Sequence, residues 1–156
     1  MNYAAIKTCD IANGPGVRTS LFVSGCTHHC KGCFQPETWD FSYGELFTQD
    51  VIDTILHSLE PAYVAGLTLL GGEPFEPANQ PAVAELLRQL RARCPGKNVW
   101  AFTGFLLDRD LLSGRVGDAA LVRHGQPLRS LARASSGFST HPSSCPSIAL
   151  RAFYRP

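Results

Sequence analysis

The sequence predicts an α/β fold in which parallel strands alternate with helices. Apolar segments switch between strand-like and helix-like patterns with short links, which is the order of a parallel sheet with right-handed crossovers. Three distinctive loops also follow the carboxyl ends of predicted strands. They contain three clustered cysteines, Gly71-Gly72 and Thr103-Gly104. Because α/β proteins bind ligands at that edge of the sheet, we expect the three loops to line one pocket.

The first strand and helix lie between residues 17 and 59. Residues 17–24 are rich in apolar and β-branched side chains, which predicts a buried strand. Residues 25–41 form a loop that contains the three cysteines. Thr48 can cap a helix that runs to Leu59, because apolar residues recur on one of its faces and Pro61 follows it.

The alternation continues to about residue 112. Residues 66–70 predict a short buried strand. Asn79 can cap a second helix, with Pro81 in its first turn, which Cys94-Pro95-Gly96 ends. Residues 98–102 predict a third strand, and residues 106–112 predict one more helix.

Length and composition exclude several classes of protein. A chain of 156 residues, 44% of them hydrophobic, predicts one globular domain or slightly more. It contains no apolar stretch of about 18 residues, which excludes an ordinary transmembrane helix. The N-terminus lacks the apolar centre of a secretory signal. We therefore expect a cytoplasmic protein without a membrane partner.

The chain changes character after about residue 122. Residues 1–122 carry 9 basic and 13 acidic side chains, whereas residues 123–156 carry five arginines, no lysine and no acid. This tail is rich in Ser and Pro without a period, and only residues 148–154 could form a short element. We expect a domain at 1–122 and an irregular tail at 123–156, disordered or translated in a shifted reading frame, that stays outside the sheet. Its arginines are scattered, so we expect no binding of nucleic acid.

Cys26, Cys30 and Cys33 form a C-x3-C-x2-C motif. Three thiolates can each bind one iron of a [4Fe–4S] cluster, which leaves the fourth iron open for a substrate or cofactor. An electron-transfer ferredoxin would use a fourth cysteine there. Zinc bound with His28 or His29 is an alternative, although a histidine this near in a tight loop has difficulty reaching the same ion.

The remaining cysteines are isolated in the sequence. Cys94 lies at a helix end, which the alternation places at the opposite edge of the sheet, so we expect it to be structural. Cys9 and Cys145 have no neighbouring cysteine, although any of the three isolated cysteines could in principle supply a fourth ligand.

These motifs resemble a known family. The cysteine loop after a first strand, followed by Phe34, resembles the radical S-adenosylmethionine enzymes. The Asn-Gly-Pro-Gly-Val-Arg segment at 13–18 resembles the glycyl-radical-enzyme activases. Residues 94–97 and 103–105, in a chain this short, resemble the activating proteins of anaerobic ribonucleoside-triphosphate reductases. The resemblance covers residues 3–113 and implies a partial (β/α) barrel of parallel strands, of the radical-SAM type.

The resemblance implies an iron–sulfur enzyme with one [4Fe–4S] cluster held by the three cysteines. In the family, the reduced cluster cleaves S-adenosylmethionine to a 5′-deoxyadenosyl radical, which removes a hydrogen from a glycine of the reductase. The cluster and cofactor carry the chemistry, so no further catalytic residue is expected. The implied partners are the anaerobic ribonucleoside-triphosphate reductase and a flavodoxin- or ferredoxin-type electron donor.

The resemblance also implies contacts to S-adenosylmethionine. Gly71, Gly72 and Glu73 match the family's GGEP element, in which glycines let the strand end approach the methionyl group and the acid accepts from its ammonium. Phe34 would pack on the adenine, and the backbone of Gly32, Cys33 and Phe34 would bind its edge. Arg18 would serve a partner, an acid or a structural salt bridge, and both histidines are expected on the loop surface.

Other functions stay open. The chain could activate another glycyl radical enzyme, such as the formate-lyase type, although those activases are usually longer. It could instead be a radical enzyme like 7-carboxy-7-deazaguanine synthase, or a non-catalytic iron–sulfur or zinc module. Family members end with an Asp-Gly turn and an Arg-Gly-Ser-x-Asn-Gln segment. Neither is present here, which favours the shifted reading frame.

Overall fold

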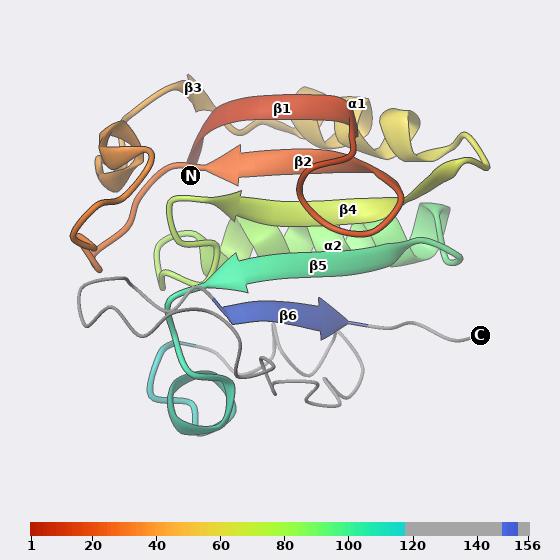
Figure 1. Ribbon diagram of the computed structural model, residues 1–156. Helices are drawn as coiled ribbons and strands as arrows, with labels where there is room; N and C mark the ends of the chain where they lie inside the picture. Colours follow the sequence, from red (N-terminus) through yellow and green to blue (C-terminus); the bar gives the residue numbers. More distant parts are fainter. Residues whose placement is uncertain (118–147, 153–156) are drawn as a thin grey trace.

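Within residues 1–117 and 148–152, which the computed structural model describes, a six-stranded mixed sheet forms the centre of the fold (Figure 1). The sheet has the order β3-β1-β2-β4-β5-β6. Its strands are β1 (Asn2–Asp10), β2 (Val17–Val23), β3 (Glu45–Leu46), β4 (Val64–Gly71), β5 (Asn98–Thr103) and β6 (Ile148–Ala152). The helices are α1 (Gln49–Leu59) and α2 (Gln80–Arg93), with a 3-10 turn η1 (Pro36–Trp39) and a π-helical turn η2 (Leu107–Leu111).

The three central strands are parallel, as the sequence predicts. β2 pairs with β4 from Val17 to Val23, and β4 pairs with β5 from Gly66 to Leu69. Helices α1 and α2 connect these strands in sequence. Because the strand order β2-β4-β5 advances in one direction, right-handed crossovers place both helices on the same face of the sheet, as Figure 1 shows.

The outer strands are antiparallel, so the expectation of an all-parallel sheet is wrong at both sides. β1 pairs with β2 and with the short β3, and β6 pairs with β5, each in antiparallel register. The sequence pattern missed β1, because its residues (NYAAIKTCD) do not alternate regularly between apolar and polar. The short link of residues 11–16 lets β1 fold back on β2.

β6 also corrects the expectation for the C-terminal segment. Its residues pair with β5 from Thr103↔Ile148 to Val99↔Ala152, so part of the chain after residue 122 belongs to the sheet. A strand of five residues can pair with the open backbone groups of β5 through its own backbone, whatever the composition around it. Residues 118–147 and 153–156 lie outside the described part, and the domain boundary near residue 122 stays a prediction.

The hydrophobic core lies between the sheet and its two helices. Its completely buried side chains come from β2, β4, α1 and α2: Leu21, Val23, Ile55, Leu56, Leu59, Leu67, Val83 and Leu86. Burying each large aliphatic side chain contributes roughly 1.5–3 kcal/mol. This layer fixes the three parallel strands and therefore the edge at which their carboxyl ends meet.

The residues expected to cap the helices do precede them, but neither caps with its side chain. Thr48 and Asn79 occupy the N-cap positions of α1 and α2 without a side-chain bond to the helix. The Asn79 amide instead donates to the carbonyls of Ser24 (2.9 Å) and Glu73 (3.0 Å). Asn79 thus joins the start of α2 to the loops that follow β2 and β4.

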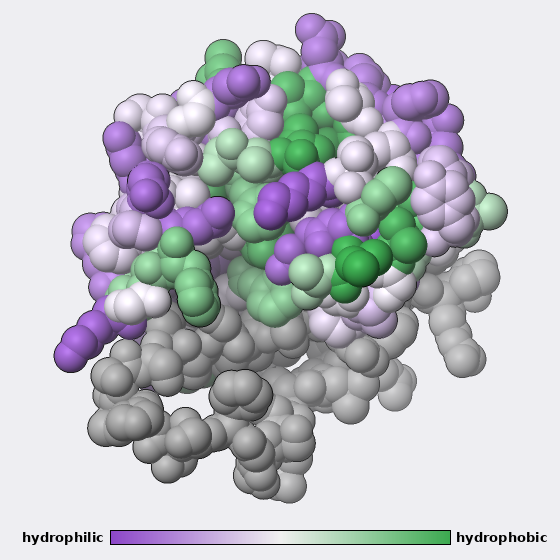
Figure 2. All heavy atoms as spheres, turned by 45° about the horizontal axis from the view of Figure 1, so that its top comes forward, coloured by the Kyte–Doolittle hydropathy of each residue, from purple (hydrophilic) through white to green (hydrophobic). Residues whose placement is uncertain are grey.

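The surface mixes polar and apolar groups. In Figure 2 hydrophobic atoms form separate groups among hydrophilic side chains. The large apolar side chains with the greatest exposure include Ile11, Phe34, Leu46 and Tyr63. In the part of the chain that the structure describes, no helix combines the length and apolarity needed to span a membrane.

Candidate metal and cofactor site

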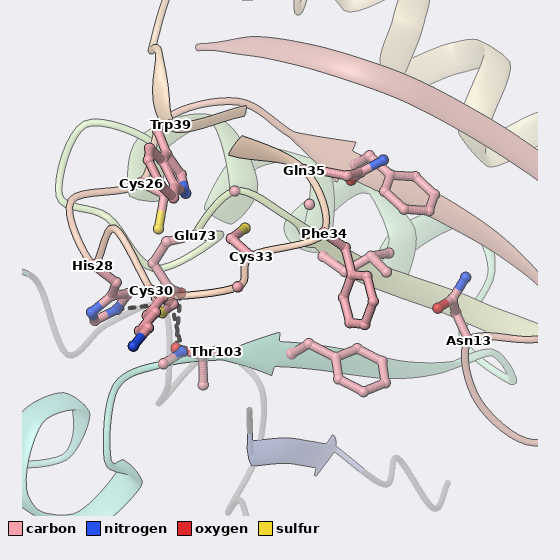
Figure 3. A pocket seen from close by; sticks show the side chains of 18 of the residues that line it. Asn13, Cys26, His28, Cys30, Cys33, Phe34, Gln35, Trp39, Glu73 and Thr103 are labelled. Carbon is pink, nitrogen blue, oxygen red and sulfur yellow. Dashed lines mark hydrogen bonds and ion pairs between the residues drawn. The ribbon is translucent and has the colours of Figure 1, made fainter. Parts of the chain in front are cut away.

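The carboxyl ends of β2, β4 and β5 meet at one cavity of about 630 Å³ (Figure 3). The cysteine loop, the loop at Gly71-Gly72 and the loop at Thr103-Gly104 all line it, which confirms that the three predicted loops form one pocket. Pockets for cofactor-sized molecules span roughly 300–1,000 Å³. The cavity therefore has room for a small molecule beside the cysteines.

Backbone hydrogen bonds fix the first cysteine. The loop doubles back after β2, so that the amide of Gly25 donates to the carbonyl of Thr38 (2.8 Å) and the amide of Cys26 donates to that of Trp39 (3.2 Å). Cys26 is only 9% exposed. Its thiol points from the end of β2 into the cavity (Figure 3).

A tight turn brings the other two cysteines to the same cavity. The amide of Cys33 donates to the carbonyl of Cys30 at 3.1 Å. Gly32, inside this turn, has a φ of +79°, a conformation that costs glycine little. Cys26, Cys30 and Cys33 therefore all line the cavity wall.

The three cysteines differ in chemical state and in burial. Burial, together with the negative charges of Glu73 and Glu76, raises the pKa of the Cys26 thiol. Cys33 is half-buried, and Cys30 is disulfide-bonded, so ligation by all three thiolates requires reduction of that bond. Within residues 1–117 and 148–152, no three His, Cys, Asp or Glu side chains gather around a point that could hold a single metal ion.

The two glycines after β4 allow a close approach, but to protein backbone. A Cβ on Gly72 would lie 2.6 Å from the carbonyl oxygen of Gly25 and 3.0 Å from that of Thr38. Gly71 has a φ of +103°, and its Cβ would lie 2.8 Å from the carbonyl oxygen of Val23. Both glycines thus let the end of β4 pack against β2 and the cysteine loop.

Glu73 is buried at the back of the cavity, 1% exposed. Its Oε1 accepts from the hydroxyl of Thr103 (2.8 Å) and the amide of Phe75 (2.9 Å), and its Oε2 accepts from the amide of Gly104 (2.8 Å). His28 Nε2 lies 3.3 Å from Oε2. Because a carboxylate offers about four lone-pair sites, these groups already occupy Glu73, and a ligand ammonium would have to replace one.

His28 faces inward, which corrects the expectation of a surface position. Its side chain is 23% exposed, and its ring packs edge-on against Phe105 with centroids 4.5 Å apart. The contact with Glu73 raises the pKa of His28. The Nε2 atom is close to the carboxylate but is not aligned as a hydrogen bond, so this is the weakest of the contacts to Glu73.

His29 and Phe34 lie further out on the cysteine loop. His29 is exposed, as expected, and stacks on Trp39 with centroids 4.7 Å apart. Phe34 lines the cavity but is fully exposed. A free aromatic face at a pocket rim is an unsatisfied apolar surface that a flat ligand could cover.

Similarity to known proteins identifies the family of this chain. Residues 12–123 match the family described as a 4Fe-4S single cluster domain. The anaerobic ribonucleoside-triphosphate reductase-activating protein of Escherichia coli (strain K12) is 44% identical over 110 residues, which are 69% of this chain and 71% of the relative. This chain belongs to the family of anaerobic ribonucleoside-triphosphate reductase-activating proteins.

Relatives from other sources have the same name. The activating protein of Vibrio cholerae serotype O1 is 44% identical over 109 residues, covering 69% of this chain and 70% of the relative. That of Enterobacteria phage T4 is 43% identical over 105 residues, covering 67% of each. The resemblance inferred from the cysteine motif and its flanks is therefore confirmed.

In this member of the activating-protein family, Arg18 has a structural role, one of the alternatives that the sequence left open, and it acts through hydrogen bonds to a hydroxyl and to backbone carbonyls. It is completely buried and donates to the hydroxyl of Thr68 (2.6 Å) and to the carbonyls of Leu67 (2.8 Å) and Pro15 (3.2 Å). Burial lowers the pKa of Arg18 to about 10. The Thr68 hydroxyl donates in turn to the carbonyl of Asn13 (2.8 Å), so Arg18 holds this loop against the sheet and Asn13 at the cavity.

The sequence pattern did not predict that Lys7 lies at the cavity. It did predict that Cys94 lies outside it. Lys7 of β1 lines the cavity, with its Nζ 5.0 Å from the centroid of the Phe22 ring. The sequence pattern did not predict β1, and without that strand it could not place Lys7 at the cavity. Cys94 is buried at the end of α2, away from the cavity, with its sulfur 3.8 Å from the carbonyl oxygen of Leu56.

Proposed function

We propose that this chain activates anaerobic ribonucleoside-triphosphate reductase by cleaving S-adenosylmethionine reductively and installing a glycyl radical on the reductase. The observation that carries the proposal is that Cys26, Cys30 and Cys33 line one cavity with room for a cofactor beside them. The relatives named as activating proteins of that reductase support the choice of partner. A flavodoxin- or ferredoxin-type protein would supply the electron.

The donor set of the cavity fits a [4Fe–4S] cluster with one open iron. Three thiolates supply ligands to three irons, and among the described residues the cavity is lined by no fourth cysteine. When bound, the cluster supplies one electron to S-adenosylmethionine and so yields a 5′-deoxyadenosyl radical. The chain itself holds the cluster, orients the cofactor and limits competing reactions.

The residues around the cysteines would hold the cofactor. The exposed ring of Phe34 offers a stacking surface for adenine, next to the backbone of Gly32 and Cys33. Gly71 and Gly72 set the position of the loop that follows β4. Glu73 would accept the methionyl ammonium by exchanging its weak contact with His28 for the ligand.

The winding of the sheet supports a partial (β/α) barrel of the radical-SAM type. Strands β2, β4 and β5 advance in one direction with α1 and α2 on one face, which is how (β/α) barrels are wound. In such barrels the carboxyl edge of the strands carries the active site. The cavity lies at that edge.

Anaerobic reconstitution of the reduced chain tests the proposal. We expect about four irons per chain and cleavage of S-adenosylmethionine under dithionite. Replacing any one of Cys26, Cys30 and Cys33 with Ala should abolish cleavage. Cys94→Ala is the matched control, because Cys94 is buried outside the cavity, and it should keep the cluster. Full activity of Cys30→Ala would contradict the proposal.

The protein on which a glycyl radical forms distinguishes the proposed function from related activities. A glycyl radical detected by electron paramagnetic resonance on the anaerobic ribonucleotide reductase supports the proposed function. A radical formed only on a formate-lyase-type enzyme, or turnover of a deazapurine precursor without any glycyl radical, would replace it. A cluster that forms without cleaving the cofactor would indicate a non-catalytic module.

A further inference from the structure

A second buried acid, Glu76, contacts the cysteine loop. Glu76 lies in the connection between β4 and α2 and is 5% exposed. Its Oε1 accepts from both the amide (2.8 Å) and the hydroxyl (2.6 Å) of Thr27. Thr27 directly follows Cys26 in the chain. A carboxylate from a neighbouring loop therefore holds the residue next to a proposed cluster ligand.

The backbone around Glu76 fixes the position of its carboxylate. The amide of Glu76 donates to the carbonyl of Glu73 (3.2 Å), and its own carbonyl accepts from the amides of Asn79 (2.8 Å) and Gln80 (3.0 Å). Gln80 is the first residue of α2. Glu76 is thus anchored to the start of a helix that the hydrophobic core holds in place.

Glu73 and Glu76 contact consecutive residues of the cysteine loop. Glu76 binds Thr27, whereas Glu73 contacts His28. The loop segment that follows Cys26 therefore packs against two buried carboxylates.

Within residues 1–117, Glu76 forms no ion pair. The ion pairs between residues 1 and 117 involve His28, His57, Arg88, Arg93 and Arg109, and none of them includes Glu76. Charges separated by protein interact more strongly than charges separated by water. Glu76 is a buried acid held against Thr27, the residue next to Cys26.

We propose that Glu76 is a positioning residue of the cluster site, which orders the loop at Cys26 and lowers the reduction potential of the bound cluster. The inference rests on the proposed function. Reduction adds negative charge to a cluster, and a fixed carboxylate nearby disfavours that step. The hydrogen bonds to Thr27 act separately, since they order the loop whatever the charge of the acceptor.

Two substitutions separate the charge from the hydrogen bonds. Glu76→Gln keeps an oxygen that can accept both bonds from Thr27 but removes the charge, whereas Glu76→Ala removes both. After anaerobic reconstitution, the midpoint potential of the cluster is measured by redox titration with electron paramagnetic resonance. Loss of iron to a chelator measures how firmly the loop holds the cluster.

We expect Glu76→Gln to take up as much iron as the unaltered chain and to show a more positive midpoint potential. Glu76→Ala should show the same shift and, in addition, several-fold faster loss of iron. Glu85→Gln is the matched control, because it removes a charge from a side chain on α2 that is 41% exposed. It should change neither the potential nor the rate.

Each outcome decides one part of the inference. If the unaltered chain binds no cluster, the proposed function fails. If it binds about four irons but Glu76→Gln keeps its potential, the charge effect is refuted. If Glu76→Ala loses iron no faster than Glu76→Gln, the positioning effect is refuted. Should Glu76→Ala not fold, Thr27→Val removes the hydroxyl donor alone and should lose iron faster than the unaltered chain; an equal rate overturns the positioning role.

Discussion

At the residue scale, Gly72 shows how closely the loops around the cavity pack. A Cβ at this position would meet the carbonyl oxygens of Gly25 and Thr38, so Gly72→Ala must displace the cysteine loop. We expect a loss of about 1–3 kcal/mol in the free energy of unfolding, as for other overpacked sites. Urea denaturation of the apo chain measures it, and iron uptake should fall as well.

Gly96→Ala is the control for this change, because a Cβ on Gly96 would meet no atom within 4 Å. The sequence pattern favours a narrower effect, in which a side chain at Gly72 weakens cofactor binding while the cluster still assembles. Because a Cβ on Gly72 would point at the cysteine loop, we expect reduced assembly of the cluster in Gly72→Ala. Normal iron uptake by Gly72→Ala together with weaker cofactor binding would favour the narrower effect.

Asp10, at the end of β1, makes stability depend on pH. Burial alone would raise the pKa of Asp10, but hydrogen bonds from Asn13 and the amide of Ala12, together with the positive charge of Lys7, lower the pKa below 3.8. A carboxyl whose pKa falls on folding stabilises the fold above its unfolded pKa, and loses this contribution as the pH falls through the folded pKa. Asp10 therefore contributes at neutral pH and not in strong acid.

We expect the difference in stability between Asp10→Asn and the unaltered chain to become smaller as the pH falls. Asp10→Asn should unfold at a lower urea concentration than the unaltered chain at pH 6, and the gap should narrow below about pH 3.8, the ordinary Asp value. Asp50→Asn, in the first turn of α1, is the control. A gap for Asp10→Asn that stays constant down to pH 2 would show that the effect is not electrostatic.

At the element scale, the sequence predicts the parallel strands at the centre of the sheet but not the antiparallel strands at its two sides. β2, β4, β5, α1 and α2 lie within a few residues of their predicted bounds, because each buries one continuous apolar face in the same core. β1 is half-buried along most of its length and has no such pattern. The helix expected at 106–112 is the π-helical turn η2.

The strand β6 predicts an effect of truncation. A chain that ends at residue 147 would leave the backbone groups of β5 unpaired, and an open edge of this kind favours pairing between molecules. We expect such a chain to self-associate and to melt at a lower temperature. A chain that ends at residue 152 keeps β6 and should behave like the full chain. Light scattering after size-exclusion chromatography distinguishes the two, and a monomeric chain of 147 residues would refute the prediction.

At the scale of the whole molecule, the two edges of the parallel strands serve different purposes. The carboxyl edge carries the cavity, while at the opposite edge Lys97 donates to the carbonyls of Pro61 (2.8 Å) and Val64 (2.7 Å). The sequence could predict that three loops meet at one edge, because topology alone requires it. It could not predict contacts such as Thr27 with Glu76, since two residues far apart in sequence carry no periodic signal of their meeting.

Cluster binding should stabilise the whole fold, because a group that binds only the folded state shifts the unfolding equilibrium. Saturation at about 100 times the dissociation constant contributes about 2.7 kcal/mol. For a domain of this size that corresponds to a rise of roughly 5–10 °C in Tm. Scanning calorimetry of apo and loaded chain measures it, with Cys26→Ala, which should show no rise, as the control. Equal Tm values for apo and loaded chain would contradict the prediction.

The pairing of β6 with β5 has a consequence for the order of folding. The units β1-β2, β2-α1-β4 and β4-α2-β5 each join neighbours along the chain, so their loops close at low entropic cost. The contact from Thr103 to Ile148 closes a far longer loop, and contacts of that kind slow folding. β6 should therefore dock last on a sheet that is already formed. In native-state hydrogen exchange, its amides should exchange through the opening of lowest free energy among the strands.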